Sequence, residues 1–512
     1  MTDTPTLLHQ LDQLRLDNSF AALPPAFYTR LAPQPLTAPR LLHANEQAAE
    51  LIGLSPAALQ SEAFLRVCSG QEPLPGGDTL AAVYSGHQFG VWAGQLGDGR
   101  AHLLGEVAGP QGNWELQLKG AGMTPYSRMG DGRAVLRSSV REYLASEAMH
   151  GLGIPTTRAL ALVVSDDPVW RETRETAAIV TRMSPSFVRF GSFEHWSSRG
   201  QPDELRILAD YVIDKFYPEC RDAETGGDTG PDGALLRLLA EVTRRTALLM
   251  ADWQAVGFCH GVMNTDNMSI LGLTLDYGPY GFMDRFRLDH ICNHSDTQGR
   301  YAWNRQPSVA LWNLYRLGGS LHTLVADVEA LRGVLDRYEA IFTQAFHQRM
   351  AAKMGLHHWR ADDESLLDSL LKLMHDQQAD FTLTFRRLAD AVRGQAQGFQ
   401  DLFIDREAAG TWYERLAARH AEDALDSGNV PAGDGAAVAL ARARAMDSVN
   451  PLYVLRNHLA EQAIRAAQEG DVSEIDTLLH LLRDPYTEKH GYEAYAGLPP
   501  DWAGGIEVSC SS

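Results

Sequence analysis

The chain has 512 residues, of which 45% are hydrophobic and 21% are charged, as in an ordinary globular protein. Its 45 basic and 65 acidic residues give a formal net charge of −20, which argues against wrapping a nucleic-acid backbone as the main activity. No apolar run approaches the roughly 20 residues of a membrane helix, and the N-terminus has no basic leader, so we expect a cytoplasmic protein without nucleic-acid or membrane partners.

Composition divides the chain into regions. Residues 1–75 mix short helical patterns with Pro-rich connections, and residues 76–190 are Gly-rich and strand-like with one strong helix. Helical patterns dominate from residue 191 onward, with turn-rich segments at 219–233 and 426–436 that we expect to be exposed loops. Apolar residues recur at helical spacing over residues 321–352 and 364–394, so residues 321–500 are expected to be helical, before a flexible tail at 501–512.

The first candidate site is a glycine-rich turn, Gly94-Gln-Leu-Gly97-Asp-Gly99-Arg100, between strand-like segments. Glycine lets backbone N–H groups approach phosphate oxygens closely, and the guanidinium of Arg100 adds N–H donors that can bind a phosphate in a bidentate manner. A plain hairpin is the alternative interpretation of this turn.

The next candidate is a lysine and glutamate pair. The segment from Trp114 to Lys119 alternates, with Leu116 and Leu118 on one face and Gln117 and Lys119 on the other, which predicts a half-buried strand with Lys119 on its polar side. A helix is predicted over residues 134–152, with Glu142 in its middle. A kinase places a Glu there as the partner of the lysine that meets nucleotide phosphates. A surface lysine is the alternative.

Two further segments carry candidate phosphate contacts. Gly130-Asp131-Gly132-Arg133 lies between the strand and the helix, where it could cap the helix or contact nucleotide. It is not a Walker A loop, because no Gly-Lys-Ser/Thr follows. Arg182 and Arg189 flank a Ser-Pro turn and could clamp separate phosphate groups, although surface ion pairing is the commoner fate of an arginine.

Residues 258–281 carry the most specific pattern. His260 is followed seven residues later by Asn267, and Asp276 comes nine residues after that in an Asp-Tyr-Gly triplet. This is the skeleton of a kinase catalytic loop with two metal ligands, Asn267 and Asp276. Val262 stands where a protein kinase keeps its catalytic Asp, so ordinary phosphoryl transfer is disfavoured. Asp266, next to the candidate metal ligand Asn267, could accept a proton from a hydroxyl or else stabilise the turn, and His260 is expected to be structural.

The order of these regions predicts an α+β, protein-kinase-like bilobal fold, with a β-rich N-lobe, an α-rich C-lobe and an additional helical C-terminal region. We expect residues 1–75 to be an extension packing on the lobes, 76–190 to be the nucleotide-binding N-lobe, and 191–320 to be the C-lobe with the catalytic loop and metal site.

Several long motifs resemble the selenoprotein O family, also called YdiU in bacteria. They are Tyr84-Ser-Gly-His-Gln-Phe-Gly90, Leu116-Gln-Leu-Lys-Gly-Ala-Gly-Met-Thr-Pro-Tyr-Ser-Arg128, Arg137-Ser-Ser-Val-Arg-Glu-Tyr143, His260-Gly-Val-Met-Asn-Thr-Asp-Asn267 and Leu275-Asp-Tyr-Gly-Pro-Tyr-Gly-Phe-Met-Asp284. The resemblance implies a pseudokinase that binds ATP inverted and transfers AMP, or UMP from UTP, to protein hydroxyl side chains, with Mg²⁺ or Mn²⁺. Protein substrates, including the protein itself, would be its partners.

The resemblance also implies roles by position. The residues expected to contact nucleotide are Gly97, Gly99, Arg100, Lys119, Asp131, Gly132, Arg182, Arg189 and Asp276. Glu142 would be the partner of Lys119, Asp266 the base, and Asn267 and Asp276 the metal ligands. Two alternatives remain: an atypical protein or small-molecule kinase that transfers the γ-phosphate, and an inactive nucleotide-binding scaffold.

Five cysteines, Cys68, Cys220, Cys259, Cys292 and Cys510, are too few and too scattered for a disulfide framework. One redox pair is nevertheless possible. Cys510 lies in the C-terminal tail, at a position that resembles the one holding selenocysteine in eukaryotic relatives, and Cys292 follows the Asp276 site. We expect that His290 or His294 could lower the pKa of Cys292 and that a Cys292–Cys510 bond would slow the enzyme. Two unrelated thiols are the alternative.

Overall fold

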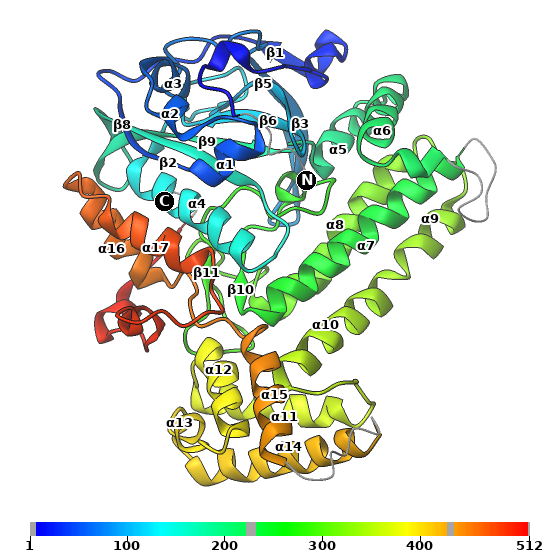
Figure 1. The fold of residues 1–512 in the computed structure, drawn as a ribbon. Coiled ribbons are helices and arrows are strands. Elements are labelled where there is room, and N and C mark those ends of the chain that lie inside the picture. Colours follow the sequence, from blue (N-terminus) through cyan, green and yellow to red (C-terminus); the bar gives the residue numbers. More distant parts are fainter. Residues whose placement is uncertain (1–6, 222–231, 427–434, 510–512) are drawn as a thin grey trace, which may run out of the picture.

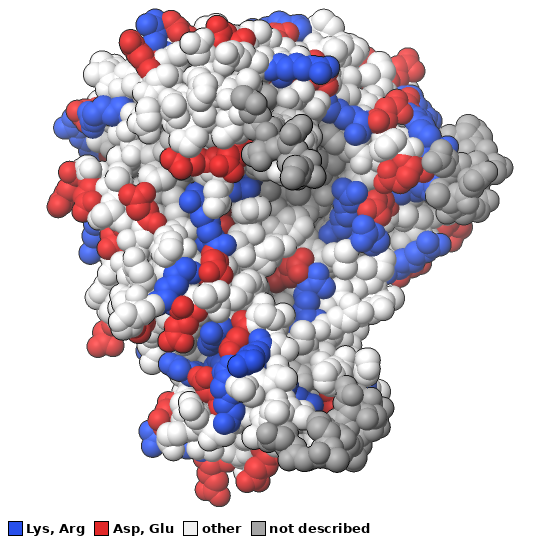
Figure 2. Space-filling view, viewed as in Figure 1, with Lys and Arg blue, Asp and Glu red and all other residues white. Residues whose placement is uncertain are grey.

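The computed structural model describes residues 7–221, 232–426 and 435–509. It is an α+β protein in which strands dominate the first part of the chain and helices the rest (Figure 1). Within these ranges no helix is both long and apolar enough to cross a membrane. Basic and acidic side chains are interspersed over the face drawn in Figure 2, without a continuous basic stripe.

One antiparallel sheet of nine strands organises the first part of the described chain. Its main path runs β1-β3-β5-β6-β9-β8-β2, with β4 paired to β3 and β7 paired to β9. The strands are β1 (Tyr28–Arg30), β2 (Arg40–Ala44), β3 (Leu80–Gln88), β4 (Val91–Gly97), β5 (Ala101–Gly109), β6 (Gly112–Lys119), β7 (Ala134–Val135), β8 (Arg158–Trp170) and β9 (Arg174–Ser184).

Each face of this sheet belongs to a different hydrophobic core. Leu116 and Leu118 of β6 lie in a core shared with α1 (Glu46–Leu51), α2 (Pro56–Leu59) and α3 (Glu62–Cys68). The opposite core includes Val140 and Leu144 of α4 (Leu136–Gly151). The sheet is therefore covered by the N-terminal segment on one side and by α4 on the other, as layered packing requires.

The alternation predicted for β6 is present, but its polar side is not exposed. Glu115, Gln117 and Lys119 have exposed fractions of 2%, 1% and 8%. Phe187 and Val188, which follow β9, line an enclosed space together with Glu115 and Gln117. The prediction of a half-buried strand was wrong because this polar face points into the molecule, where its residues can act together.

Helices form the second part of the fold around a small antiparallel pair of strands, β10 (Phe258–Cys259) and β11 (Gly281–Phe282), which residues 260–280 connect. The 23-residue helix α7 packs against α8, α9 and α10. The helices of this part are α5 (Phe190–Ser198), α6 (Pro202–Phe216), α7 (Gly233–Ala255), α8 (Gln306–Leu321), α9 (Val328–Leu335) and α10 (Tyr338–Met354).

The C-terminal helices do not form one unit. The helices α11 (Asp363–Gln377), α12 (Phe381–Val392), α13 (Gln397–Gln400), α14 (Arg406–Asp426) and α15 (Gly435–Asp447) pack together with the end of α10. By contrast, α16 (Asn457–Gln468) and α17 (Ser473–Leu482) return to lie beside α4 (Figure 1). Arg141 of α4 donates to the Asn457 side chain at 3.2 Å.

Both long helical predictions are interrupted in the structure. The segment 321–352 contains all of α9 and most of α10, and the segment 364–394 is divided between α11 and α12. The second break occurs at Gln378, whose φ of 53° is left-handed, and Asp380 then caps α12 by accepting the Leu383 amide at 2.8 Å. The predicted loops at 219–233 and 426–436 lie largely outside the described residues.

Candidate nucleotide-binding and catalytic site

Lys119 and Glu142 meet where β6 ends against α4. The lysine Nζ lies 2.5 Å from Glu142 Oε2, and both side chains are buried. Glu142 has a second partner, since its Oε1 accepts from Arg182 Nη1 at 3.1 Å. Arg182 comes from β9, where it stands opposite Gln117 of β6 and donates to the Gln117 amide oxygen. Adjacent antiparallel strands thus place these groups on one face of the sheet.

Asp276 is the point on which the cations converge. Its Oδ1 lies 2.5 Å from Arg182 Nη1 and 3.8 Å from Lys119 Nζ, and its Oδ2 lies 2.5 Å from Arg189 Nη1. Burial alone would raise the pKa of Asp276, but the three cations outweigh it and hold the pKa well below 3.8. Its φ of 60° places this aspartate in the left-handed region. Such strain is found where the surrounding structure requires one orientation.

Asp266 is joined to this cluster through Arg189. It belongs to a 3-10 turn, Thr265–Asn267, and its backbone carbonyl accepts from Arg189 Nη1 at 2.7 Å. Gln88 Nε2 donates to Asp266 Oδ2 at 3.1 Å, while Oδ1 is buried without a hydrogen-bond partner. Burial raises the pKa of Asp266 to about 6, although the Gln88 bond opposes the rise. A carboxylate with one unused oxygen can accept a proton.

A hydrogen bond to the catalytic loop orients the side-chain amide of Asn267. Its Nδ2 donates to the Val262 carbonyl at 2.9 Å, which leaves the side-chain oxygen as the free acceptor. His260 donates from Nε2 to the Leu275 carbonyl at 3.0 Å and stacks on Trp253, as a structural residue would. Among the described residues no cluster of three His, Cys, Asp or Glu side chains could by itself hold a metal ion.

The first glycine turn joins β4 to β5. A Cβ at Gly97 would lie 2.4 Å from Tyr126 Cγ, and one at Gly99 would lie 2.9 Å from the Tyr126 carbonyl oxygen. These glycines are therefore required by the close approach of the segment around Tyr126. Arg100 is half-buried, and burial lowers the pKa of its guanidinium although the charges of Glu142 and Asp276 oppose this.

The second glycine turn does not cap α4. The N-cap position of that helix is Val135, and no side chain caps it. Asp131 instead pairs with Arg171 at 2.8 Å and accepts the Arg133 amide at 2.9 Å. Gly132 has a φ of 70°, and a Cβ there would lie 2.1 Å from the Gly122 carbonyl carbon. The capping alternative was wrong, and nucleotide contact stays a prediction.

Comparison with known proteins assigns the chain to a family. A model of the family described as "Protein adenylyltransferase SelO" matches residues 10–483. The chain belongs to this family. Similar proteins named "Protein nucleotidyltransferase YdiU" include those of Bordetella petrii (84% identical, covering 98% of this chain and 99% of that one), Bordetella avium (76%, covering 99% and 100%) and Dechloromonas aromatica (54%, covering 97% of each).

Three residues of this SelO-family site were not among the sequence candidates. Gln88 holds Asp266, Gln117 holds Arg182, and the ring of Tyr84 lies 4.6 Å from the Arg189 guanidinium carbon. Gln117 could have been found, because it shares the strand face of Lys119. Gln88 and Tyr84 could be found only as parts of the family motif, since their partners are far away in the sequence.

The cysteine site differs from its prediction. Cys292 donates from Sγ to the Pro279 carbonyl at 2.9 Å, and burial together with Cys259 raises its pKa well above 9. His290 does not lower that pKa, because burial reduces the pKa of His290 itself to about 4 and leaves it uncharged. The tail reaches this segment, since the His294 amide donates to the Val508 carbonyl at 2.8 Å. Cys510 lies outside the described residues.

Proposed function

We propose that this nucleotidyltransferase moves AMP from ATP, or UMP from UTP, onto Ser, Thr or Tyr hydroxyls of proteins, itself included. The observation that carries the proposal is the convergence of Lys119, Arg182 and Arg189 on the single carboxylate of Asp276. These three buried cations face two carboxylates, Asp276 and Glu142, so the cluster keeps an excess positive charge and favours additional negative charge. A triphosphate supplies that charge.

A kinase-like arrangement supports the same proposal. A β-sheet part carries the lysine, the helix α4 carries its glutamate, and the helical part carries the loop with Asp266 and Asn267. We propose that these parts are the two lobes of a kinase-like fold with a nucleotide cleft between them. The domains then follow the boundaries at residues 75, 190, 320 and 500, except that α16 and α17 support α4 rather than the C-lobe.

Different side chains would carry out the separate tasks of nucleotidyl transfer. In-line attack on the α-phosphorus expels pyrophosphate, so the site must hold the leaving group and remove a proton from the hydroxyl. Lys119, Arg182 and Arg189 would hold the β- and γ-phosphates of an inverted nucleotide. Asp266 would take the proton on its unused Oδ1, while Gln88 fixes Oδ2. Gly97, Gly99, Arg100, Asp131 and Gly132 would border the nucleotide.

The donor set fits a hard divalent cation. Asn267 presents an amide oxygen and Asp276 a carboxylate, which are the ligands that Mg²⁺ or Mn²⁺ prefers. Mg²⁺ usually completes its shell with water and substrate phosphates, so two protein ligands suffice. When bound, the ion would neutralise charge on the phosphates during transfer.

A γ-phosphate kinase is the second candidate, because a kinase uses the same Lys–Glu pair. Val262 disfavours it, since a valine cannot accept a proton from a hydroxyl. The test is to incubate the protein with ATP labelled at either the α or the γ phosphate, with Mn²⁺ and a bacterial lysate. Protein labelled from the α position supports nucleotidyl transfer, whereas label from the γ position alone refutes it. No label from either position would favour a scaffold.

The partners follow from the same chemistry. We propose that the chain works in the cytoplasm on protein hydroxyls and takes no nucleic acid, in keeping with its net charge of −20. Mass spectrometry of a treated lysate, searched for added AMP or UMP, would identify the acceptors. Loss of the signal in Asp276→Ala would connect it to this site.

A further inference from the structure

The hairpin between β3 and β4 lies directly on the catalytic loop. Three contacts join its tip to consecutive residues of that loop: the His87 amide donates to Thr265 Oγ1 at 2.7 Å, Gln88 Nε2 donates to Asp266 Oδ2 at 3.1 Å, and the Phe89 amide donates to Asn264 Oδ1 at 3.0 Å. Whatever lies on this tip is therefore next to Asp266.

The outer side of the tip is apolar and exposed. The exposed fractions are 39% for Phe89, 70% for Val91 and 41% for Trp92. Exposed large apolar side chains that gather on one feature usually mark a binding surface. Here three of them gather beside the residue proposed as the base.

The apolar surface continues onto α8 with positive charge. The His87 ring lies 5.0 Å from Trp92 and 5.3 Å from Trp312 of α8. Arg300 and Arg316 lie over the Trp312 ring, at 4.7 and 5.0 Å from its centroid. We call Phe89, Val91, Trp92, Arg300, Trp312 and Arg316 together the hairpin surface.

The two arginines of the hairpin surface are available for an outside partner. Over the described ranges neither of them forms an ion pair, and Arg300 Nε is buried without an acceptor. Glu194 is the nearby acid, but it is buried and already paired with His87 at 2.6 Å. An arginine on an aromatic ring is held ready to bind a carboxylate with both N–H groups.

We propose that the hairpin surface docks the acceptor segment of the protein substrate, and that this segment carries an acidic side chain near the modified hydroxyl. The inference rests on the proposed function. The acidic side chain would pair with Arg300 and Arg316, and an apolar side chain would cover Val91 and Trp92. The hairpin surface thereby selects acceptor sites by their neighbours.

The spacing limits where the acidic residue lies. A Cβ at Gly90 would be 2.8 Å from Arg300 Cζ, and Gly90 is two residues from Gln88, which touches Asp266. An extended peptide segment rises about 3.3 Å per residue, so about three of its residues would run alongside the chain from Gln88, at Asp266, to Gly90, at Arg300. We therefore place the acidic residue within about three positions of the acceptor hydroxyl.

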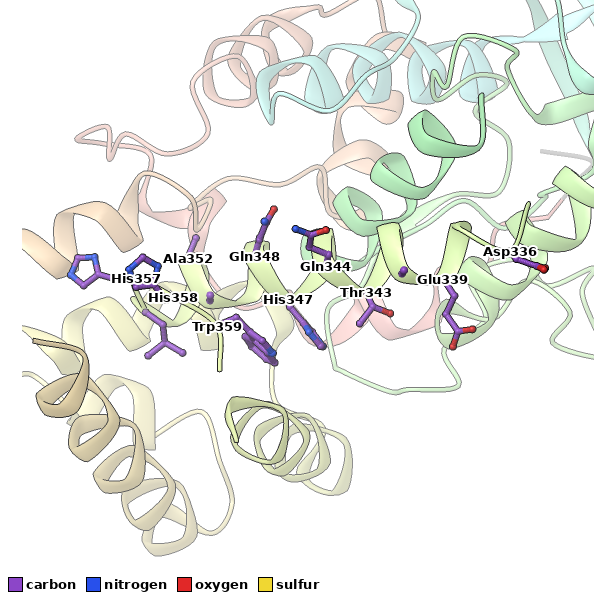
Figure 3. A pocket seen from close by; sticks show the side chains of 13 residues that line it. Asp336, Glu339, Thr343, Gln344, His347, Gln348, Ala352, His357, His358 and Trp359 are labelled. Atoms are coloured by element: carbon purple, nitrogen blue, oxygen red, sulfur yellow. The ribbon is translucent and has the colours of Figure 1, made fainter. Parts of the chain in front are cut away.

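Another hollow among the described residues fits such a segment poorly. It is a groove of about 970 Å³ along α10, where His347 and Trp359 stack (Figure 3). Its lining includes Asp336 and Glu339 but no lysine or arginine. An acidic segment would be repelled there, so charge complementarity favours the hairpin surface.

The test uses short synthetic peptides with one central serine and one phenylalanine, whose other neighbours are glutamate, glutamine or lysine. AMP incorporation from α-labelled ATP gives kcat/KM, and fluorescence anisotropy gives peptide affinity independently of activity. The variants are Arg300→Gln with Arg316→Gln, and Trp92→Ala. Arg415→Gln, an exposed arginine of α14, is the matched control, and Glu339→Gln tests the α10 groove.

We expect the wild type to favour the glutamate peptide and the double arginine variant to lose about tenfold in kcat/KM for that peptide alone. Affinity for ATP should stay the same, and Arg415→Gln should behave as wild type. Transfer that ignores peptide charge, or a double variant that loses ATP affinity instead, would overturn the docking proposal. Peptide binding with the expected charge preference but without AMP transfer would instead refute the proposed function and leave the docking surface standing.

Discussion

Arg189 Nη1 lies 2.5 Å from Asp276 Oδ2 and, with the same nitrogen, 2.7 Å from the backbone carbonyl of Asp266. One buried guanidinium therefore joins the loop with the proposed base to the loop with the proposed metal ligand. Stacking on Tyr84 fixes the guanidinium plane. Neither loop can move without disturbing the other, so the site is organised before substrate binds.

The first prediction concerns charge balance at this junction. Asp276→Asn removes the negative charge that faces Lys119, Arg182 and Arg189, so the folded protein should lose up to about 3–5 kcal/mol. Phosphates can replace the lost charge, so ATP with a chelator should raise the melting temperature of the variant more than that of the wild type. Thermal denaturation measures both effects, with the exposed Asp289→Asn as control. An unchanged melting temperature would show that Asp276 does not balance the cations.

The second prediction separates activity from stability at Lys119. Lys119→Met keeps the side-chain length but removes a phosphate contact, so transfer should fall by about 10²-fold or more. Glu142 keeps its partner Arg182 at 3.1 Å, so removal of the lysine does not leave it unpaired. The melting temperature should therefore fall only slightly. A variant that is unfolded, or fully active, would contradict this assignment.

The parts of the site that sequence predicts are those set by local geometry. Alternation along β6 puts Lys119 beside Gln117, and the spacing from Asn267 to Asp276 follows from one loop and its turn. Gln88 on Asp266 and α16 on α4 could not be predicted in this way, because each joins segments far apart in the chain. The burial of Glu115 was missed for the same reason, since residues outside β6 cover it.

The third prediction tests the proposed base. Asp266→Asn keeps the shape of the side chain and its bond to Gln88 but cannot take a proton, so turnover should fall by about 10²–10⁴-fold. Nucleotide affinity should be unchanged, because the proposed role of the carboxylate is to take the proton of the hydroxyl, and its side-chain hydrogen bond is to Gln88 and not to a cation. Calorimetric ATP binding and AMP incorporation measure the two quantities. Lost ATP binding with unchanged turnover per bound nucleotide would remove the assignment.

The fourth prediction concerns stability and pH. Burial raises the pKa of Glu115 to about 8 from its usual 4.5. Between these values the unfolded chain releases the proton and the folded protein keeps it, so stability falls as pH rises, by up to about 1.4 kcal/mol per pH unit. Glu115→Gln stays neutral and should flatten this slope, becoming more stable than the wild type near pH 8. Urea denaturation from pH 5 to 8.5 measures it, and parallel curves for the two proteins would refute it.

The last prediction concerns redox control by the tail. His294 and Val508 are joined by a hydrogen bond. His294 follows Cys292 by two residues in the sequence, and Val508 precedes Cys510 by two. A disulfide between the two cysteines would fix the segment after the Asp276 site, so we expect a reductant to raise activity and either Cys292→Ala or Cys510→Ala to abolish that response. Because the Cys292 thiol has a raised pKa and donates to a carbonyl, oxidation should be slow near pH 7 and faster in alkali. Mass spectrometry of unreduced peptides detects the bond, and Cys68→Ala, at a buried cysteine of α3, is the control. Equal activity of the wild type with and without reductant, after exposure to an oxidant in alkali, would rule the switch out.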